Sequence, residues 1–231
     1  MSELFNSLKN GLVVSCQSEG DDPFNTPEGV TLFAKAAVMG GAAGIRSQGI
    51  DKSTMIKNSV DVPVIGLLKS TFPDGTVRIT GSFKEVEKLT IINMDIIAVD
   101  GTFRLREGLT GPEFISAIKE RFDCVIMADI STVDEALACS NAGADCISST
   151  LSGYTPETAH KPKLIPDYEL VEILAGKVDK PVFAEGKIIT PEAASEMIKR
   201  GAWGVVVGTA ITRPRVITQW YINAMKESLE L

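Results

Sequence analysis

The sequence predicts an α/β protein built as a (β/α)8 barrel, the TIM-barrel architecture, in a single domain over residues 1–231. With 231 residues, 44% hydrophobic and 23% charged, the chain is long enough for one large core and is neither disordered nor fibrous. Short β-branched runs alternate with stretches of helical periodicity. Nearly continuous apolar strands indicate a sheet covered on both faces, and eight parallel units of this length close naturally into a barrel.

The expected strands are short apolar runs bounded by turn residues. They lie at 11–17, 42–46, 63–69, 95–101, 124–130, 145–151, 181–186 and 203–208. Gly-Ala stands at the start of three of these units, where glycine ends a helix, and Pro-Val opens two others. Strand, helix and turn therefore recur as one unit.

Three stretches between the strands have clear helical periodicity, at 27–39, 132–142 and 190–200. Thr190 and Pro191 are typical of an N-cap and a first helical residue. The third unit is the weakest, because residues 71–89 hold a turn signal and only a short helix. An open doubly wound sheet is the alternative fold, but no Gly-x-Gly-x-x-Gly follows the first strand.

Composition and charge limit the classes of binding partner and the cellular location to be expected. The net charge is −7 with no basic run, so neither a nucleic acid nor a membrane surface is an expected partner. The N-terminal stretch lacks a signal-peptide pattern and nothing later reaches a membrane-spanning length, which predicts a cytoplasmic protein. The four cysteines are far apart and are expected to be reduced. His160 is the only histidine, so no metal centre is expected.

Polar residues end six of the eight expected strands. In a parallel barrel this C-terminal rim and its loops form the mouth of the active site. The six residues are Gln17, Arg46, Lys69, Asp100, Asp129 and Glu185. Because strand side chains alternate, Lys69 shares its face with Leu67 and Ile65, Asp129 with Met127 and Glu185 with Phe183, and we take this face as inward.

Lys69 and Glu185 end the third and seventh strands, which lie opposite each other in a ring of eight. An opposed amine and carboxyl group suit stereochemical inversion, in which a proton next to a carbonyl leaves from one face and returns to the other. Arg46 or a protonated lysine can stabilise the oxyanion. This geometry leaves open whether one base serves both faces or two bases divide the work.

The loops after strands seven and eight, EGKIITPE and GTAITRPR, have the composition of a phosphate site. Gly186, Gly208 and Thr209 can offer backbone N–H groups, and Arg213 a forked guanidinium. Barrels often bind phosphate at this position. Glycines after strands are also common as plain turns, which is the alternative interpretation.

At these residues the sequence resembles a known family. The motifs VVSCQ, GIRSQG, PVIGLLK, IIAVDGT, IMADIST, STLSGYTPET, FAEGKIITPE and VVVGTAITRP are similar, in order and spacing, to those of N-acylmannosamine-6-phosphate 2-epimerases, over about residues 11 to 220. The resemblance implies a (β/α)8 barrel that interconverts N-acetylmannosamine 6-phosphate and N-acetylglucosamine 6-phosphate in sialic acid catabolism. It implies a phosphorylated amino sugar as substrate and no cofactor.

The resemblance also implies roles for the residues that match the motifs. Lys69 would be the base at C2, with Glu185 as the carboxyl partner that polarises or protonates the substrate. The residues implied to hold the open-chain sugar are Gln17, Arg46 and Asp129. Those implied to hold the phosphate are Gly186, Gly208 and Arg213. Ser70, Thr71 and Phe72 stand where the family usually has a second basic residue and then Asp-Tyr, which leaves the contacts of this loop and the N-acyl preference open.

Two other functions stay open beside the epimerase. A Schiff-base aldolase or lyase would also carry a lysine such as Lys69 at a strand end. A phosphosugar-binding barrel without catalysis would keep the loop from Gly208 to Arg213 but need neither Lys69 nor Glu185. Trp203 and Trp220 fall in the last unit, where they serve either core packing or the interface of a homodimer.

Overall fold

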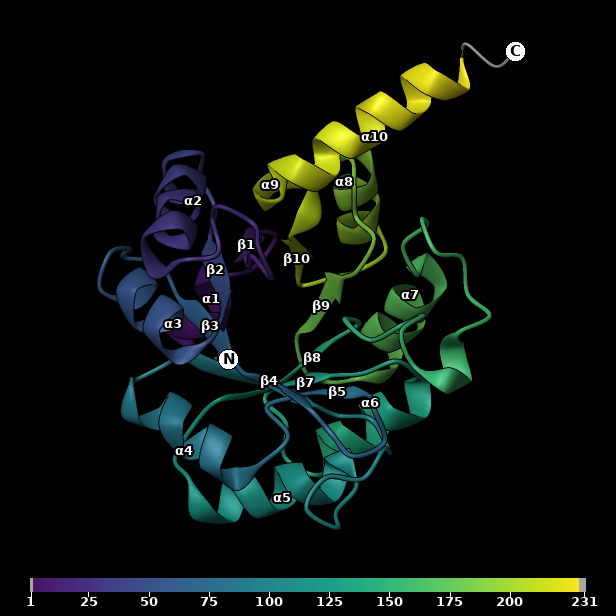
Figure 1. Cartoon of the computed structure of the whole chain (residues 1–231). Coiled ribbons are helices and arrows are strands. Elements are labelled where there is room, and N and C mark those ends of the chain that lie inside the picture. Colours follow the sequence, from purple (N-terminus) through teal and green to yellow (C-terminus); the bar gives the residue numbers. More distant parts are fainter. Residues whose placement is uncertain (1, 229–231) are drawn as a thin grey trace.

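In the computed structural model, which describes residues 2–228, eight parallel strands close into a barrel in chain order (Figure 1). Their bounds are β1 Leu12–Cys16, β2 Gly44–Gln48, β3 Val64–Leu67, β6 Ile96–Asp100, β7 Ile126–Asp129, β8 Cys146–Ser148, β9 Val182–Glu185 and β10 Gly204–Val207. Each overlaps its predicted run, so the predicted fold is confirmed. β3 and β9 stand four strands apart around the ring, on opposite sides of the barrel.

Helices alternate with the strands and cover the outside of the barrel (Figure 1). Their bounds are α1 Glu3–Ser7, α2 Pro27–Met39, α3 Ile50–Lys57, α4 Phe83–Ile91, α5 Gly111–Arg121, α6 Val133–Asn141, α7 Tyr168–Lys177, α8 Pro191–Lys199, α9 Thr209–Thr212 and α10 Pro214–Glu227, with a short 3-10 helix at Pro156–Thr158. Thr190 caps α8 as predicted, since its side chain accepts from the Ala193 N–H. None of these helices in residues 2–228 is long and apolar enough to cross a bilayer.

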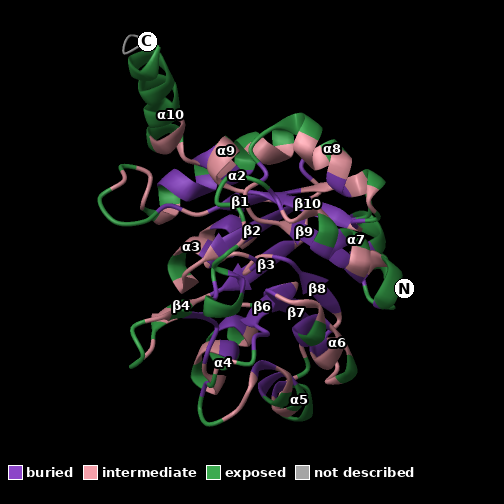
Figure 2. Ribbon diagram, turned by 90° about the vertical axis from the view of Figure 1, so that its right-hand side faces the viewer, coloured by how far each residue is buried: buried purple, intermediate pink, exposed green. Residues whose placement is uncertain are grey.

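The core has two layers, one inside the barrel and one between the strands and the helices. Figure 2 shows the strands of the barrel largely buried. Leu67, Met127 and Phe183 belong to the inner layer, which confirms the inward face predicted for the alternating side chains. Leu8, just after α1, is fully buried in the same layer and approaches Gly44 and Gly204 at the starts of β2 and β10. Glycine at these two positions leaves room for Leu8 to close the N-terminal end of the barrel.

Several strand ends differ from the prediction, and two of the differences change the surroundings of Lys69 and Arg46. β3 ends at Leu67, and Lys69 begins a separate antiparallel hairpin of β4, Lys69–Thr71, and β5, Val77–Ile79. The turn signal in the weak third unit makes this hairpin, with Gly75 at φ +78°. β2 continues to Gln48, so Arg46 lies below the rim instead of at it.

The last helix, α10, extends away from the barrel (Figure 1). Along its whole length, Pro214–Glu227, it buries none of its residues, and Figure 2 shows it exposed or partly exposed throughout. Tyr221 is 70% exposed and Met225 68%. Trp203, by contrast, packs against the inner core and donates from its ring N–H to the Phe5 carbonyl at 2.8 Å. The two tryptophans therefore have different surroundings, because Trp203 packs against the core and Trp220 is 38% exposed on α10.

Candidate active site

A cavity of about 530 Å³ opens among the loops that follow the C-terminal ends of the barrel strands. Lys69 and Glu185 both line it, one from the hairpin that follows β3 and the other from the end of β9. Predicted site residues that line the cavity are Gln17, Lys69, Glu185, Gly186, Gly208 and Arg213. Sequence segments far apart in the chain thus meet at one mouth, as the strand-end argument requires.

Arg46 and Asp129, the other two predicted residues, lie beneath this cavity in the barrel interior. Their side chains are 1% and 0% exposed. The guanidinium makes a two-pronged contact with the Asp129 carboxylate, at 3.1 Å from Nη1 to Oδ1 and 2.5 Å from Nη2 to Oδ2. The structure therefore places this pair as support for the cavity floor; its contact with a sugar stays a prediction.

Glu185 completes a buried cluster of three charged groups. Its Oε2 lies 3.0 Å from Nη1 of Arg46, and its side chain is 14% exposed. Burial works against the charged guanidinium, but Asp129 and Glu185 outweigh burial and hold the pKa of Arg46 above its ordinary value. One cation thus serves two carboxyl groups, which leaves the cluster one negative charge in excess when both are ionised.

The excess charge bears on Glu185, the group closest to the cavity. Burial raises the pKa of Glu185 above its ordinary value, and the charge of Asp129 adds to the rise, while Arg46 opposes it. A carboxyl group in this setting is better able to hold a proton near neutral pH than an exposed glutamate is. This is the property that a general acid needs.

Thr150 links the two carboxyl groups of the cluster. Its Oγ1 lies 2.7 Å from Asp129 Oδ1 and 3.0 Å from Glu185 Oε2. Because a hydroxyl has one hydrogen, it cannot donate to both. When Glu185 is protonated it can donate to Thr150, whose own hydrogen then goes to Asp129. The sequence does not single out Thr150, because it follows β8 inside a run of small polar residues and does not end an apolar strand.

Lys69 makes a close ion pair with a residue that the sequence did not single out. Its Nζ lies 2.5 Å from Oε1 of Glu19, and the lysine side chain is 32% exposed. Arg213 approaches the same Glu19 oxygen at 3.5 Å. Although burial alone would raise the pKa of Glu19, the hydrogen bond and charge of Lys69, with Arg213, hold it below its ordinary value. Glu19 lies in the loop after β1, where only its charge could have marked it.

The wall of the cavity also carries further positive groups and glycine. Arg213, Lys187 and Lys163 line the cavity together with Gly186 and Gly208. A chain with a net charge of −7 thus places three cationic side chains, besides Lys69, around one cavity. These side chains give the cavity the local charge that a phosphate needs against the overall field.

Of the six predicted polar strand ends, Asp100 is the one that neither lines the active-site cavity nor joins the cluster of Arg46, Asp129 and Glu185. It is fully buried and pairs with Arg104 at 2.6 Å and with Arg106 at 2.9 Å. It also accepts from the N–H and the hydroxyl of Thr102. These contacts within one loop satisfy the carboxylate and give it a structural role.

The arrangement can remove a proton from a carbon and protonate an adjoining oxygen. Lys69 and Glu185, whose pKa is raised, line one cavity, and the other cationic side chains of that cavity can hold an anionic group. Residues 30–227 match the family model described as "Putative N-acetylmannosamine-6-phosphate epimerase". The chain belongs to this family. The resemblance seen in the sequence motifs is thereby confirmed.

Relatives in the family match nearly the whole chain. A protein of Caldanaerobacter subterraneus subsp. tengcongensis is 44% identical over 228 residues, covering 97% of this chain and 95% of the relative. One from Cutibacterium acnes is 42% identical and covers 95% of this chain and 96% of the relative. Both are named "Putative N-acetylmannosamine-6-phosphate 2-epimerase".

One solved structure bears the name of the family, and a second shares the fold. The N-acetylmannosamine-6-phosphate 2-epimerase from Clostridium perfringens superposes with a TM-score of 0.90 at 38% identity, over 96% of each chain. Thiamine phosphate pyrophosphorylase from Pyrococcus furiosus superposes with a TM-score of 0.63 at 18% identity, covering 91% of this chain and 90% of that one. The second likeness shows the shared barrel fold alone.

Proposed function

We propose that this chain interconverts N-acetylmannosamine 6-phosphate and N-acetylglucosamine 6-phosphate, a reaction of sialic acid catabolism, by removing and returning the proton on C2. The observation that carries the proposal is the shared cavity of Lys69 and Glu185, in a family whose relatives bear this name. A sugar phosphate substrate is consistent with the cytoplasm, which we propose as the location.

In the proposed reaction the phosphate of the open-chain sugar lies near Gly186, Gly208 and Arg213, and its C1 and C2 lie near Lys69 and Glu185. The amine of Lys69 takes the C2 proton, and the bonding pair moves into the C1–C2 bond while the carbonyl pair moves onto O1. Glu185 donates its proton to O1 or holds it by a hydrogen bond. Return of a proton to the other face of C2 inverts that carbon.

Arg46 and Asp129 act in this scheme through Glu185. Arg46, 3.0 Å from the Glu185 carboxyl group, keeps that group oriented. When Glu185 is protonated it can donate to Thr150, and Thr150 can then donate to Asp129. Gln17 lines the cavity from the end of β1 and donates to Ser15 Oγ at 2.9 Å, so its amide oxygen is available to a sugar hydroxyl.

The proposal is tested with N-acetylmannosamine 6-phosphate in deuterated water, followed by proton NMR. We expect N-acetylglucosamine 6-phosphate to form and deuterium to enter at C2. Because the phosphate supplies much of the binding, the unphosphorylated sugar is expected to have a kcat/KM lower by at least about 100-fold. Arg213→Ala should raise KM for the phosphate ester, whereas Arg215→Ala, on a neighbouring arginine 53% exposed and paired with Asp21, serves as the control.

Two results would contradict the epimerase. If borohydride with the sugar phosphate labels Lys69 covalently and the sugar is cleaved, the chain is a Schiff-base lyase. If the sugar phosphate binds but no C2 proton exchanges, the chain is a binding protein. Each of these is one of the alternatives that the sequence left open.

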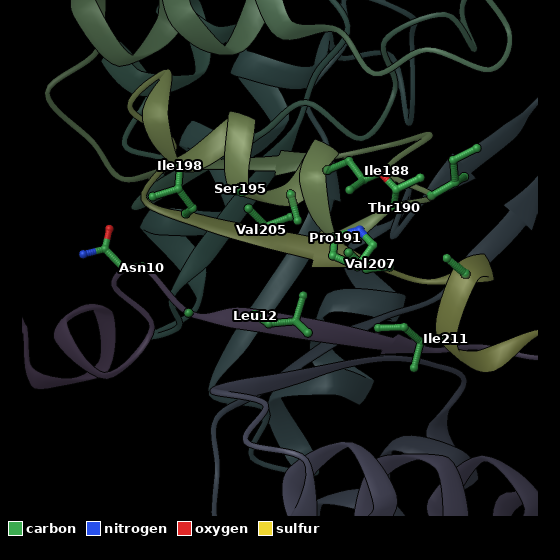
Figure 3. A pocket seen from close by; sticks show the side chains of 14 residues that line it. Asn10, Leu12, Ile188, Thr190, Pro191, Ser195, Ile198, Val205, Val207 and Ile211 are labelled. Carbon is green, nitrogen blue, oxygen red and sulfur yellow. The ribbon is translucent and has the colours of Figure 1, made fainter.

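We further propose that the chain forms a homodimer by exchange of α10. In a (β/α)8 barrel the helix after the last strand packs over the last and first strands. Here α10 extends outward, and an apolar groove of about 380 Å³ stays open between β1, β10 and α8 (Figure 3). Its walls include Leu12, Val205, Val207, Ile198 and Ile211.

The exposed side of α10 has the chemistry of the missing cover. Ile217, Trp220, Tyr221 and Met225 follow helical spacing on one side of it. An apolar groove and an apolar helix that the same chain leaves apart are complementary between two copies, and exchange of one element is a common route to dimers. Trp220 and Val216 also line the active-site cavity, so the exchange would fix one of its walls.

Light scattering during gel filtration tests this dimer. We expect a mass of twice the chain's 24.7 kDa for the wild type. A double substitution, Tyr221→Asp with Met225→Asp, should give the single-chain mass, because a charge on each residue cannot be buried in the groove without a partner. Gln219→Asp, on the exposed opposite side of α10, is the matched control. A wild type that stays monomeric at tens of micromolar would refute the exchange.

A further inference from the structure

Glu19 brings a negative charge into the mouth of the active site. Its side chain lines the cavity together with Lys69 and Arg213. One oxygen, Oε1, lies 2.5 Å from the amine of Lys69 and 3.5 Å from the guanidinium of Arg213. A single carboxylate oxygen therefore contacts both the proposed base and the proposed phosphate-binding arginine, and the proposed reaction gives Glu19 no part.

The loop that carries Glu19 is anchored close to both of its ends. The amine of Lys52, on α3, donates to the Ser18 carbonyl at 3.2 Å. Phe24 packs against Phe33 of α2, with ring centres 4.6 Å apart. The side chain of Glu19 is 46% exposed, so its carboxylate has solvent to turn into. A change of rotamer therefore frees both cations without a movement of the loop.

The position of this carboxylate conflicts with that of the proposed substrate. The phosphate lies near Arg213 and C2 lies near Lys69 in the proposed reaction, so the carbons between them cross the space between the two cations. The Oε1 atom of Glu19 contacts both cations and lies in that space. A phosphate and a carboxylate beside one guanidinium also repel each other, because both are anions. The carboxylate therefore has to leave when a sugar phosphate binds.

A third cation gives the displaced carboxylate a partner. Burial lowers the pKa of Lys52, and the charge of Glu19 opposes this shift, so the two groups already act on each other. Lys52 lies on α3, outside the lining of the active-site cavity. A carboxylate that turns from Lys69 toward Lys52 leaves the cavity free while it remains near a positive charge.

We infer that Glu19 is a built-in competitor of the substrate's phosphate: its carboxylate occupies the anion position in the substrate-free site and is displaced when the sugar phosphate binds. This inference rests on the proposed epimerase function. The displacement precedes proton transfer, so its cost falls on binding and not on the chemical step. Glu19 thereby raises KM and keeps small anions such as inorganic phosphate out of the cavity, whereas Lys69 and Glu185 set kcat.

Glu19→Gln tests the inference, because glutamine keeps the shape of the side chain without its charge. With the ion pairs partly exposed, we expect KM for N-acetylmannosamine 6-phosphate to fall about three- to tenfold and kcat to stay within about twofold. Calorimetric titration with inorganic phosphate should show a Kd lower by a similar factor. Asp21→Asn is the matched control, since Asp21 lies on the same loop, is 93% exposed and pairs with Arg215. We expect this control to leave KM and Kd unchanged.

A lower kcat in Glu19→Gln, with KM and the Kd for phosphate unchanged, would overturn the competitor and make Glu19 a positioning residue for Lys69. An equal fall of KM and Kd in Asp21→Asn would also overturn it, because the effect would then be one of net charge alone. Either result leaves the epimerase standing. A wild type that exchanges no C2 proton would overturn the epimerase instead. The titration with inorganic phosphate needs no turnover, so it still decides whether Glu19 competes with an anion.

Discussion

Lys69→Ala is expected to abolish deuterium entry at C2 and to lower kcat by about 10²- to 10⁴-fold, the range that a positioned general base contributes. The cause is chemical, because alanine leaves the cavity without the amine proposed to accept the proton. Removing Lys69 also deletes the ion pair with Glu19, but that pair is partly exposed, so the loss of folding stability should be small. NMR of the sugar phosphate in deuterated water measures both the exchange and the turnover.

Lys57→Ala is the matched control for this variant. Lys57 is 30% exposed and pairs with Asp95 at 2.5 Å, nearly the exposure and the distance found for Lys69 and Glu19. It lies on α3, away from the cavity. We expect Lys57→Ala to keep wild-type turnover. Turnover retained in Lys69→Ala would remove that residue from the role of base and leave Glu185 as the group to test for it.

Glu185→Gln is expected to lose activity and to gain stability at neutral pH. Glutamine keeps the shape of the side chain but can neither release a proton nor carry the charge. Arg46 keeps its two-pronged contact with Asp129, so the substitution leaves a neutral buried pair instead of a cluster with one excess negative charge. Removing a carboxyl group would be destabilising only if it left the guanidinium without a partner.

The pH dependence of this gain follows from the raised pKa of Glu185. At a pH below the ordinary glutamate value, Glu185 is protonated in both the folded and the unfolded chain, and its charge costs nothing. As pH rises from the ordinary value to the raised one, the unfolded chain ionises first, so the wild type loses stability over this interval. Above the raised pKa the loss is constant. Glutamine does not titrate, so the stability of the variant does not fall over this pH interval through this residue.

Thermal unfolding of both proteins across pH measures the effect. We expect equal midpoints in acid and a higher midpoint for Glu185→Gln at pH 7 to 8, by about 2–4 °C for each kcal/mol. One unit of raised pKa corresponds to about 1.4 kcal/mol. Glu172→Gln, at a carboxylate 61% exposed on the surface, should show no such pH-dependent difference. A lower midpoint for Glu185→Gln at neutral pH would mean that the charge stabilises the fold, contrary to the cluster's charge balance.

Much of the site could be predicted from strand ends alone. Glu185 and Asp129 end β9 and β7, and both stand two residues after an inward-facing side chain, Phe183 or Met127. Alternation along a strand is a local rule, so it transfers from sequence to structure without knowledge of the rest of the chain. The capping of α8 by Thr190 was predictable for the same reason.

Contacts between loops were beyond the reach of the sequence. Nothing in residues 17–20 shows that Glu19 will pair with Lys69, fifty positions later, or that Thr150 will join Asp129 to Glu185. Arg46 was expected at the rim, as the last residue of its strand. Pairing between β2 and β3 extends β2 by two residues, to Gln48, so Arg46 lies buried below the rim. These contacts depend on how whole strands pair and pack against one another in the closed barrel.

The sequence by itself determined the eight repeating units, the inward face of each strand and the polar groups that meet at one end of the barrel. Only the tertiary structure decided that Arg46 and Asp129 lie under Glu185, that a hairpin carries Lys69, and that α10 leaves a groove open. The physical reason is range: side-chain alternation and turns act between neighbours in sequence, whereas burial and charge balance are summed over groups that only the closed barrel brings together.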